Sequence, residues 1–358
     1  MATISEVQEK RPSSPIAQPS FWESLKKSVR ESRLPWLFIF PSALVMAAVT
    51  LYPQAYQVYM SLTNFDERHF NPENSPDYVG LENFSQILIE GIPIANYDFF
   101  RILAFNLIWT AVNIVFHVSI GISVAMLLNA KGLLGRRIYR AIFVLGWAIP
   151  QFVGALVWRN AFDDDYGAIN LLAAEINKSF GLSIPNDTRW LINEVPPIDI
   201  PGVSWPFDIF EILPLAFYAV LIANIWFGWP FMMVVATGAL QSIPKELYEA
   251  ADVDGASKWK QFWAITVPLI RPAMVPAIML GTIWTFNAFN VIWFITGGGP
   301  SRKTEILVTQ SYNLLNITSL PGRFGMAAAF SIVVFFILLL ITLINNRITR
   351  ATESYDEV

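Results

Sequence analysis

The sequence predicts an all-α, polytopic membrane protein with six transmembrane helices. Of its 358 residues, 54% are hydrophobic and 15% are charged, whereas about a quarter of the residues in soluble domains are charged. Six apolar stretches each come near the roughly 20 residues that a helix needs to cross a bilayer. They cover residues 36–62, 102–128, 138–158, 213–240, 269–295 and 324–344. Several contain Pro, Gly or Asn, which membrane helices tolerate where neighbouring helices satisfy the backbone.

The distribution of positive charge predicts how these spans are oriented. The segments before the first span, between the second and third, between the fourth and fifth, and after the sixth hold 16 Lys and Arg in total, whereas the three outward loops hold 8. Such residues mark the cytoplasmic side, so both termini are expected in the cytoplasm. The expected parts are a cytoplasmic arm (1–35), a transmembrane domain (36–347) and a cytoplasmic tail (348–358), with outward loops at 64–101, 159–212 and 296–323 and a cytoplasmic connection at 243–268.

The arm and the longest outward loop have weaker patterns. The arm carries an apolar face from Phe21 to Val29 among basic residues, which fits an interfacial helix or a disordered basic arm equally well. No cleavable signal peptide is expected, because the first span follows about 35 polar residues. Residues 167–180 predict an amphipathic helix. For Asp163-Asp164-Asp165, a solvated acidic turn or a helix N-cap is favoured over a cation site.

The connection from 243 to 272 is the most informative stretch of the chain. Pro244 suits the first turn of a helix, and Gly255 suits a left-handed cap after it. A second helix is predicted from Ser257 to about Thr266, with Pro268 and Pro272 marking its boundary with the next span. The pattern alone fits either a helix-turn-helix at the membrane surface or an ordinary solvated loop.

The residues in this connection resemble a known signature. Glu249-Ala250-Ala251, then Gly255, then Ile265-Thr266-Val267-Pro268 resembles the EAA signature of ABC importer permeases, with Val267 in place of the usual Leu. The fuller IPKELYEAADVDGAS is similar to the carbohydrate-uptake, MalF/UgpA-like branch. In that family this segment is the coupling helix that sits in a cleft of a separate ATPase. The resemblance therefore implies coupling roles for Glu246, Glu249, Ala250, Ala251, Asp254, Gly255 and Pro268.

Two later stretches extend the resemblance to the substrate path. Residues 226–231 match the W-x-G-x-P-[YF] stretch and residues 284–290 the second contact region of MalF-type permeases, although Thr285 and Ala288 replace two of its asparagines. In the third span, Gly146 stands where the family often has Pro, which leaves a kink there open. On pattern alone, these aromatics are packing residues and these asparagines interhelical contacts. The resemblance instead implies substrate binding by Trp226, Phe227, Gly228, Phe231, Trp284, Thr285, Asn287 and Asn290.

A polar stripe runs along the second span. Asn106, Thr110, Asn113, His117 and Gly121 are spaced three or four residues apart and share one helical face. Polar groups at bilayer depth should point into the bundle. Hydrogen bonding between helices is the favoured interpretation, ahead of a role in the substrate path.

Several functions are disfavoured by the sequence. GGGPSRKT at 297–304 nearly fits a P-loop, but Arg302 replaces the final Gly and no strand precedes it, so a tight turn is expected; it also resembles the TGGGP signature of sugar permeases. There is no Cys, and no zinc or nucleophile motif. No enzyme activity, metal or cofactor is therefore expected in this chain. An ion-coupled secondary transporter is disfavoured because no Asp or Glu lies well inside a span.

The resemblance implies a type I ABC importer permease fold in a bacterial or archaeal inner membrane. The implied partners are a second, MalG-like permease, a MalK-like ATPase dimer that binds ATP and Mg, an extracytoplasmic solute-binding protein, membrane lipids and a sugar, and no nucleic acid. The spans lack the basic residues expected for a phosphate ligand, which favours a neutral sugar such as a malto-oligosaccharide, trehalose or another α-glucoside. A glycerol-phosphate or polyol importer is the alternative.

Overall fold

The computed structural model describes residues 20, 22–23, 33–92, 94, 97–130, 132–193, 213–315 and 323–349. Over these residues the chain is helical, apart from its loops and one isolated bridge between Thr63 and Tyr78. The possible arm helix, the proline-rich residues from 194 to 212 and nearly all of the tail lie outside the described residues. The chain divides into two compact units, Met1–Gln57 and Val58–Val358.

The first unit contributes most of one apolar span, Leu37–Ser61. It consists of α2 (Arg33–Met46), the π-helical turn η1 (Ala47–Leu51) and α3 (Tyr52–Ser61), which runs on into the second unit. The helix continues through Pro41 and Pro53. The wider turn of η1 directly precedes Pro53, and such a turn relieves the clash between a proline ring and the carbonyl one turn earlier.

The second unit holds the remaining spans. Its helical elements are η2 (Glu67–Phe70), α4 (Glu82–Ser85), η3 (Gln86–Glu90), α5 (Phe99–Asn129), α6 (Arg136–Ala148), α7 (Gln151–Ala161), α8 (Ala168–Phe180), α10 (Leu215–Ser242), α11 (Lys245–Val253), α12 (Lys258–Gln261), η4 (Phe262–Thr266), α13 (Val267–Phe286), α14 (Phe289–Ile295), α15 (Leu307–Asn313) and α16 (Phe324–Thr349). Within the described residues, five helices are long and apolar enough to cross a membrane, and α6 with α7 makes a sixth, bent span. The six predicted spans coincide with these segments.

The third span is a bent pair of helices rather than one straight helix. The axes of α6 and α7 meet at 92°. The break falls at Ile149 and Pro150: Ile149 is extended, as residues before proline tend to be, and Pro150 precedes the first turn of α7. Gly146 lies inside α6, so the kink that was left open there occurs at Pro150 instead.

The predicted boundary at Pro268 and Pro272 is wrong. Helix continues without a break from Lys258 to Phe286, with Pro272 and Pro276 inside α13, and the apolar span extends through α14 to Ile295. Pro268 occupies the first turn of α13. As at Pro53, a π-helical turn, here η4, lies directly before the proline. The helix therefore accommodates the ring instead of ending.

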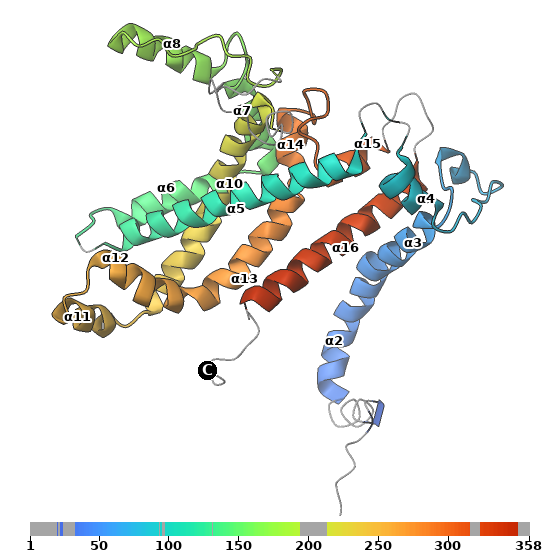
Figure 1. Ribbon diagram of the computed structural model, residues 1–358. Helices are drawn as coiled ribbons and strands as arrows, with labels where there is room; N and C mark the ends of the chain where they lie inside the picture. The colour runs from blue at the N-terminus through green and yellow to red at the C-terminus, as the bar shows by residue number, and fades with distance from the viewer. Residues whose placement is uncertain are drawn as a thin grey trace, which may run out of the picture. The chain divides into compact units, whose positions relative to one another are not determined.

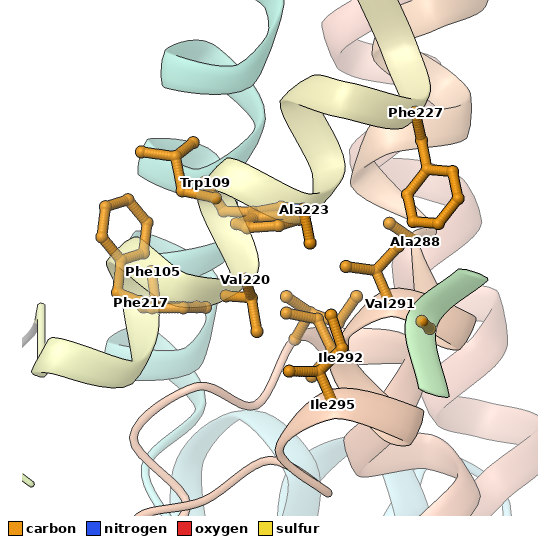
Figure 2. Close-up of a cluster of buried hydrophobic side chains, with 13 residues drawn as sticks. Phe105, Trp109, Phe217, Val220, Ala223, Phe227, Ala288, Val291, Ile292 and Ile295 are labelled. Atoms are coloured by element: carbon orange, nitrogen blue, oxygen red, sulfur yellow. The ribbon is translucent and has the colours of Figure 1, made fainter. Parts of the chain in front are cut away.

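α5 packs along α10, and α13 contacts both of them (Figure 1). Close approach depends on small residues: a Cβ at Gly121 of α5 would lie 2.6 Å from the Cβ of Met232, and one at Gly281 of α13 would lie 2.6 Å from its Cε. At one end of these helices, Phe105 and Trp109 of α5 meet the ring of Phe217 edge to face. Figure 2 shows this group with residues of α14 in one buried cluster.

The described part of the longest outward loop matches the sequence pattern. The predicted amphipathic helix is α8, which ends at Gly181 in the left-handed conformation. Asp163 accepts hydrogen bonds from the N–H groups of Asp165 and Tyr166 at 3.1 and 2.9 Å, and Asp164 pairs with Arg189 at 3.1 Å. The three acidic residues therefore form a turn, as favoured over a cation site.

Candidate functional site

The first candidate site is the helix-turn-helix formed by α11 and α12. Gly255 has a φ of 72°, the left-handed conformation predicted for it. The N–H of Ala256 donates to the carbonyl of Ala251 at 2.9 Å, and the N–H of Gly255 donates to that of Asp252 at 3.1 Å. These two bonds form a Schellman motif, which ends α11 and turns the chain sharply into α12.

Side-chain hydrogen bonds hold α11 against the segment that follows it. Lys258 Nζ lies 2.7 Å from Asp252 Oδ1, and Gln261 Nε2 donates to the carbonyl of Ala256 at 2.9 Å. The hydroxyls of Tyr248 and Thr266 are 2.9 Å apart. These contacts were not predicted from the sequence. The only signal was a set of polar side chains spaced across a glycine turn.

The predicted coupling residues gather on the outer surface of this element. Glu246, Glu249, Ala250, Asp254, Gly255 and Pro268 are exposed, and Ala251 is half-buried. Val253 is 88% exposed and Trp259 is 71% exposed. Internal hydrogen bonds hold this element together, and it exposes small, acidic and apolar side chains side by side. Such an element is suited to contact another protein.

The second candidate site is a cavity of about 580 Å³ bordered by α5, α6, α7, α10 and α13. Its aromatic walls come from Trp147, Phe227, Phe231 and Trp284, where the rings of Phe231 and Trp284 meet at 5.1 Å. Its polar groups belong to His117, Gln151, Asn224, Thr285 and Asn287. The cavity thus combines flat apolar surfaces with amide, imidazole and hydroxyl groups, and no Asp, Glu, Lys or Arg is among its lining residues.

Six of the eight predicted substrate residues line this cavity: Phe227, Gly228, Phe231, Trp284, Thr285 and Asn287. The other two lie outside its lining. Trp226 packs edge to face against Trp158, and a Cβ at Gly146 would lie 3.2 Å from the Trp226 ring. Gly146 therefore makes room for Trp226. Asn290 donates to Gln151 Oε1 at 3.4 Å, so it contacts a residue of the lining without belonging to the lining.

Trp147, Gln151 and Asn224 also line the cavity and were not predicted from the sequence. Trp147 lies in the last turn of α6 and Gln151 begins α7, so the bend at Pro150 brings both to the cavity. The signal available in the sequence was Pro150, which lies between these two residues and favours a bend. Asn224 lies one helical turn before Gly228 on α10, and its position on that face was the available signal.

The polar stripe of α5 forms hydrogen bonds with both neighbouring helices. Toward α10, Asn113 Oδ1 accepts from Asn224 Nδ2 at 2.8 Å, and His117 Nε2 lies 3.0 Å from the Asn224 carbonyl. Toward α13, Asn106 Nδ2 donates to the carbonyl of Phe286 at 3.2 Å. These contacts confirm the favoured interpretation, hydrogen bonding between helices. His117 also lines the cavity.

The GGGP loop, which follows the C-terminal end of α14, is the tight turn that its glycines predicted. Gly297 and Gly298 have φ values of 61° and 88°, and Ser301 and Arg302 are also left-handed. The turn is closed by the Thr304 hydroxyl, which donates to the Gly299 carbonyl at 2.6 Å.

Glu305 is buried beneath this loop and was not singled out from the sequence. It is 1% exposed, and a Cβ at Gly298 would lie 2.5 Å from its Cγ. Asn313 Nδ2 donates to Glu305 Oε1 at 2.7 Å, and Arg302 Nε is 3.8 Å from the same oxygen. Burial raises the pKa of Glu305 to about 7, although the positive charges of Arg302 and Arg101 oppose the shift.

Comparison with known proteins supplies relatives for this architecture. The chain is 33% identical over 323 residues to a maltodextrin transport system permease, MdxF of Bacillus subtilis, covering 88% of this chain and 69% of the relative. It is 30% identical over 325 residues to a trehalose/maltose transport system permease, MalF of Thermococcus litoralis, covering 91% of this chain and 96% of the relative.

A solved structure shares the fold. It is described as a bacterial ABC transporter involved in the import of the acidic polysaccharide alginate, and it matches with a TM-score of 0.68 at 19% identity, over 93% of this chain and 100% of that one. A family model for the binding-protein-dependent transport system inner membrane component matches residues 117–354. With its helical spans, its exposed helix-turn-helix and these relatives, the chain belongs to the family of inner-membrane components of binding-protein-dependent transport systems.

Proposed function

We propose that this chain is a permease subunit of an ATP-driven importer for a neutral sugar, with a malto-oligosaccharide, trehalose or another α-glucoside as its substrate. The observation that carries the sugar class is the cavity: aromatic faces stand beside amides and a hydroxyl, with no charged side chain in its lining. Sugars offer hydroxyls around an apolar ring face, and this lining complements both. A phosphate-bearing solute would need basic partners, so a glycerol-phosphate substrate is disfavoured.

The names of the relatives agree with this class. Maltodextrin and trehalose/maltose appear in the names of two permeases that resemble this chain over most of its length. The family further supports a complex with a second permease, two ATPase subunits and an extracytoplasmic binding protein. In this complex the proposed orientation puts α11 and α12 in the cytoplasm, where Glu249 contacts a basic residue of the ATPase and Gly255 sets the shape of the turn.

The proposed mechanism is alternating access, and the continuity of one helix supports it. The span Lys258–Ile295 begins in the helix-turn-helix and reaches Trp284, Thr285 and Asn287 in the cavity lining. Because a helix rises about 1.5 Å per residue, the path from Lys260 to Trp284 is about 36 Å long. Movement of the ATPase subunits would therefore reach the cavity wall through a helix with no intervening loop.

Uptake by the reconstituted complex tests the cavity assignment. Replacing Trp284 and Asn287 together by Ala should lower the initial rate of maltose or trehalose uptake at least tenfold, since an aromatic face and an amide are lost together. The control is Leu340→Ala, which alters an exposed side chain on α16 away from the cavity. Unchanged kinetics for several sugars in the double variant would remove these two residues from the substrate path.

A labelling experiment tests the orientation and the coupling assignment. The chain has no cysteine, so Val253→Cys introduces a single thiol on α11. It should react with a membrane-impermeant maleimide only from the cytoplasmic side, and less so when the ATPase is bound. Glu249→Lys and Gly255→Asp should abolish coupled uptake while the chain stays inserted. Labelling from outside, or normal uptake by both variants, would overturn the coupling assignment.

A further inference from the structure

Asn224 presents one end of its side-chain amide to the cavity, and a residue outside the cavity decides which end. Asn224 belongs to the lining, whereas Asn113, on the neighbouring helix α5, does not. Both side chains are buried, at 4% and 0% exposure. An amide has a donor end and an acceptor end, so the orientation of Asn224 sets the kind of ligand group that it can bind.

The orientation follows from a backbone carbonyl, which can only accept. Asn113 Nδ2 lies 2.8 Å from the carbonyl oxygen of Trp109, so this end of Asn113 must be its NH₂ group. The opposite end is then Oδ1, and it accepts from Asn224 Nδ2 at 2.8 Å. With one Nδ2 hydrogen held in this way, the amide of Asn224 cannot turn over, and its Oδ1 stays on the other side of the amide.

The backbone of Asn224 is held by a second residue of α5. His117 Nε2 lies 3.0 Å from the Asn224 carbonyl, and since the carbonyl accepts, Nε2 carries the proton. The ring fits against Gly228, where a Cβ would lie 2.1–2.5 Å from three ring atoms. Asn224 is therefore fixed both at its side chain and at its main chain.

We infer that Asn113 is a positioning residue for substrate recognition: it fixes Asn224 as a hydrogen-bond acceptor, so that this wall of the cavity selects a ligand hydroxyl that donates. This inference rests on the proposed function and adds a specificity determinant to it. Asn113 acts through Asn224 and contacts no substrate. A free Asn224 amide could rotate and accept or donate, which would weaken that selection.

The test compares variants in proteoliposomes that contain the complete transport complex, with saturating binding protein loaded with maltose. Asn113→Leu removes both hydrogen bonds at similar volume, and uptake should fall about tenfold, the effect of one buried hydrogen bond. Asn224→Leu should cause a similar loss. Since one residue acts through the other, the double variant should be no worse than Asn224→Leu alone.

Further variants separate positioning from structural support. Asn113→Asp keeps an acceptor facing Asn224 and should retain more uptake than Asn113→Leu. Thr110→Val removes a buried hydroxyl one turn away, whose bond to the Asn106 carbonyl stays within α5, and it should leave uptake unchanged. Deoxy-maltoses, each lacking one hydroxyl, provide the specificity readout: wild-type complex should discriminate strongly against one of them, and Asn113→Leu should lose that discrimination.

The outcomes distinguish this inference from the proposed function. If the intact wild-type complex takes up neither maltose nor trehalose, the proposed sugar class fails. If it does take them up, two results overturn the inference alone: multiplicative losses in the double variant, or unchanged discrimination among the deoxy-maltoses in Asn113→Leu. A smaller amount of assembled complex with unaltered discrimination would likewise show that Asn113 supports structure only.

Discussion

Replacing Gly228 by Ala tests the close packing of α10 against α5. Gly228 lies within α10, and an added methyl would sit 2.1–2.5 Å from atoms of the His117 ring, closer than non-bonded atoms approach. The neighbour is a buried ring held by a hydrogen bond to the Asn224 carbonyl, so it cannot move aside easily. Either the ring leaves its place or the helices separate.

The size of the effect follows from opposing terms. Overpacking a close contact costs about 1–3 kcal/mol, and loss of the His117 hydrogen bond costs about 1 kcal/mol. Exchanging Gly for Ala inside a helix offsets about 1 kcal/mol. Gly228→Ala should therefore destabilise the chain by about 1–3 kcal/mol and lower the melting midpoint of the purified complex, measured by Trp fluorescence, by several degrees.

The same helix provides a matched control. Gly238 also lies within α10, and a Cβ there would meet nothing within 4 Å. Gly238→Ala should leave the midpoint unchanged or raise it slightly. His117→Ala should make room for the methyl of Gly228→Ala, so the double variant should be more stable than the sum of the single losses predicts. Equal midpoints for Gly228→Ala and Gly238→Ala would refute the reasoning.

Three further predictions concern the other sites. Gly255→Val should reduce ATPase co-purification and coupled uptake more than Gly255→Asn, because Asn tolerates a φ of 72° and a β-branched residue does not; equal losses would exclude a role for the left-handed turn. Asp252→Ala removes the contacts to Lys258 and Gln261 and should lower coupled uptake a few-fold without affecting membrane insertion, which surface labelling of the chain would check. Burial raises the pKa of Glu305 from 4.5 to about 7, so the folded protein binds this proton more tightly than the unfolded chain does. The stability contributed by protonated Glu305 is therefore complete below about pH 4.5 and is lost as the pH rises through 7. Glu305→Gln should reduce the change of the melting midpoint between pH 5 and 8, and an unaltered pH dependence would contradict the assignment.

Hydropathy located the spans but not their internal geometry. The mean hydropathy of a stretch reports its length and polarity, and all six predicted spans coincide with apolar helices. Proline patterns were less informative. Pro268 was expected to mark a boundary, yet helix runs through it, whereas Pro150 breaks the third span by 92°. The difference lies in the preceding turn, which is π-helical before Pro268 and extended at Ile149, and the residues alone do not specify that turn.

The candidate site was predictable where the chain is locally regular. The predicted cavity residues lie on α10 and on α13 with its C-cap Asn287, where sequence spacing translates directly into position on a helix. Trp147 and Gln151 escaped prediction because they reach the cavity only through the bend between α6 and α7. Glu305 escaped for a different reason: a carboxylate in a polar loop suggests solvent exposure, and its burial depends on the glycine turn that folds over it.

The contacts of α5 indicate how this subunit moves during transport. Trp109 Nε1 donates to the Thr285 carbonyl at 3.0 Å, and Asn106 Nδ2 donates to that of Phe286 at 3.2 Å, so α5 satisfies acceptors in the last turn of α13. The same helix holds Asn224 of α10 through Asn113. Breaking either set would leave buried polar groups without partners, at about 1–3 kcal/mol each.

Movement at α12 should therefore carry α5, α10 and α13 together as one body, because sliding one helix past another would break these bonds while a joint rotation preserves them. The cavity wall then keeps its internal geometry throughout the cycle. What must change is the surface that faces this wall. Trp147 and Trp284 belong to the wall and remain 50% and 48% exposed in this chain, so the second permease has room to cover them. In the mechanism that we propose, the substrate would be released when two preformed walls separate, with no rearrangement of the side chains that line the cavity.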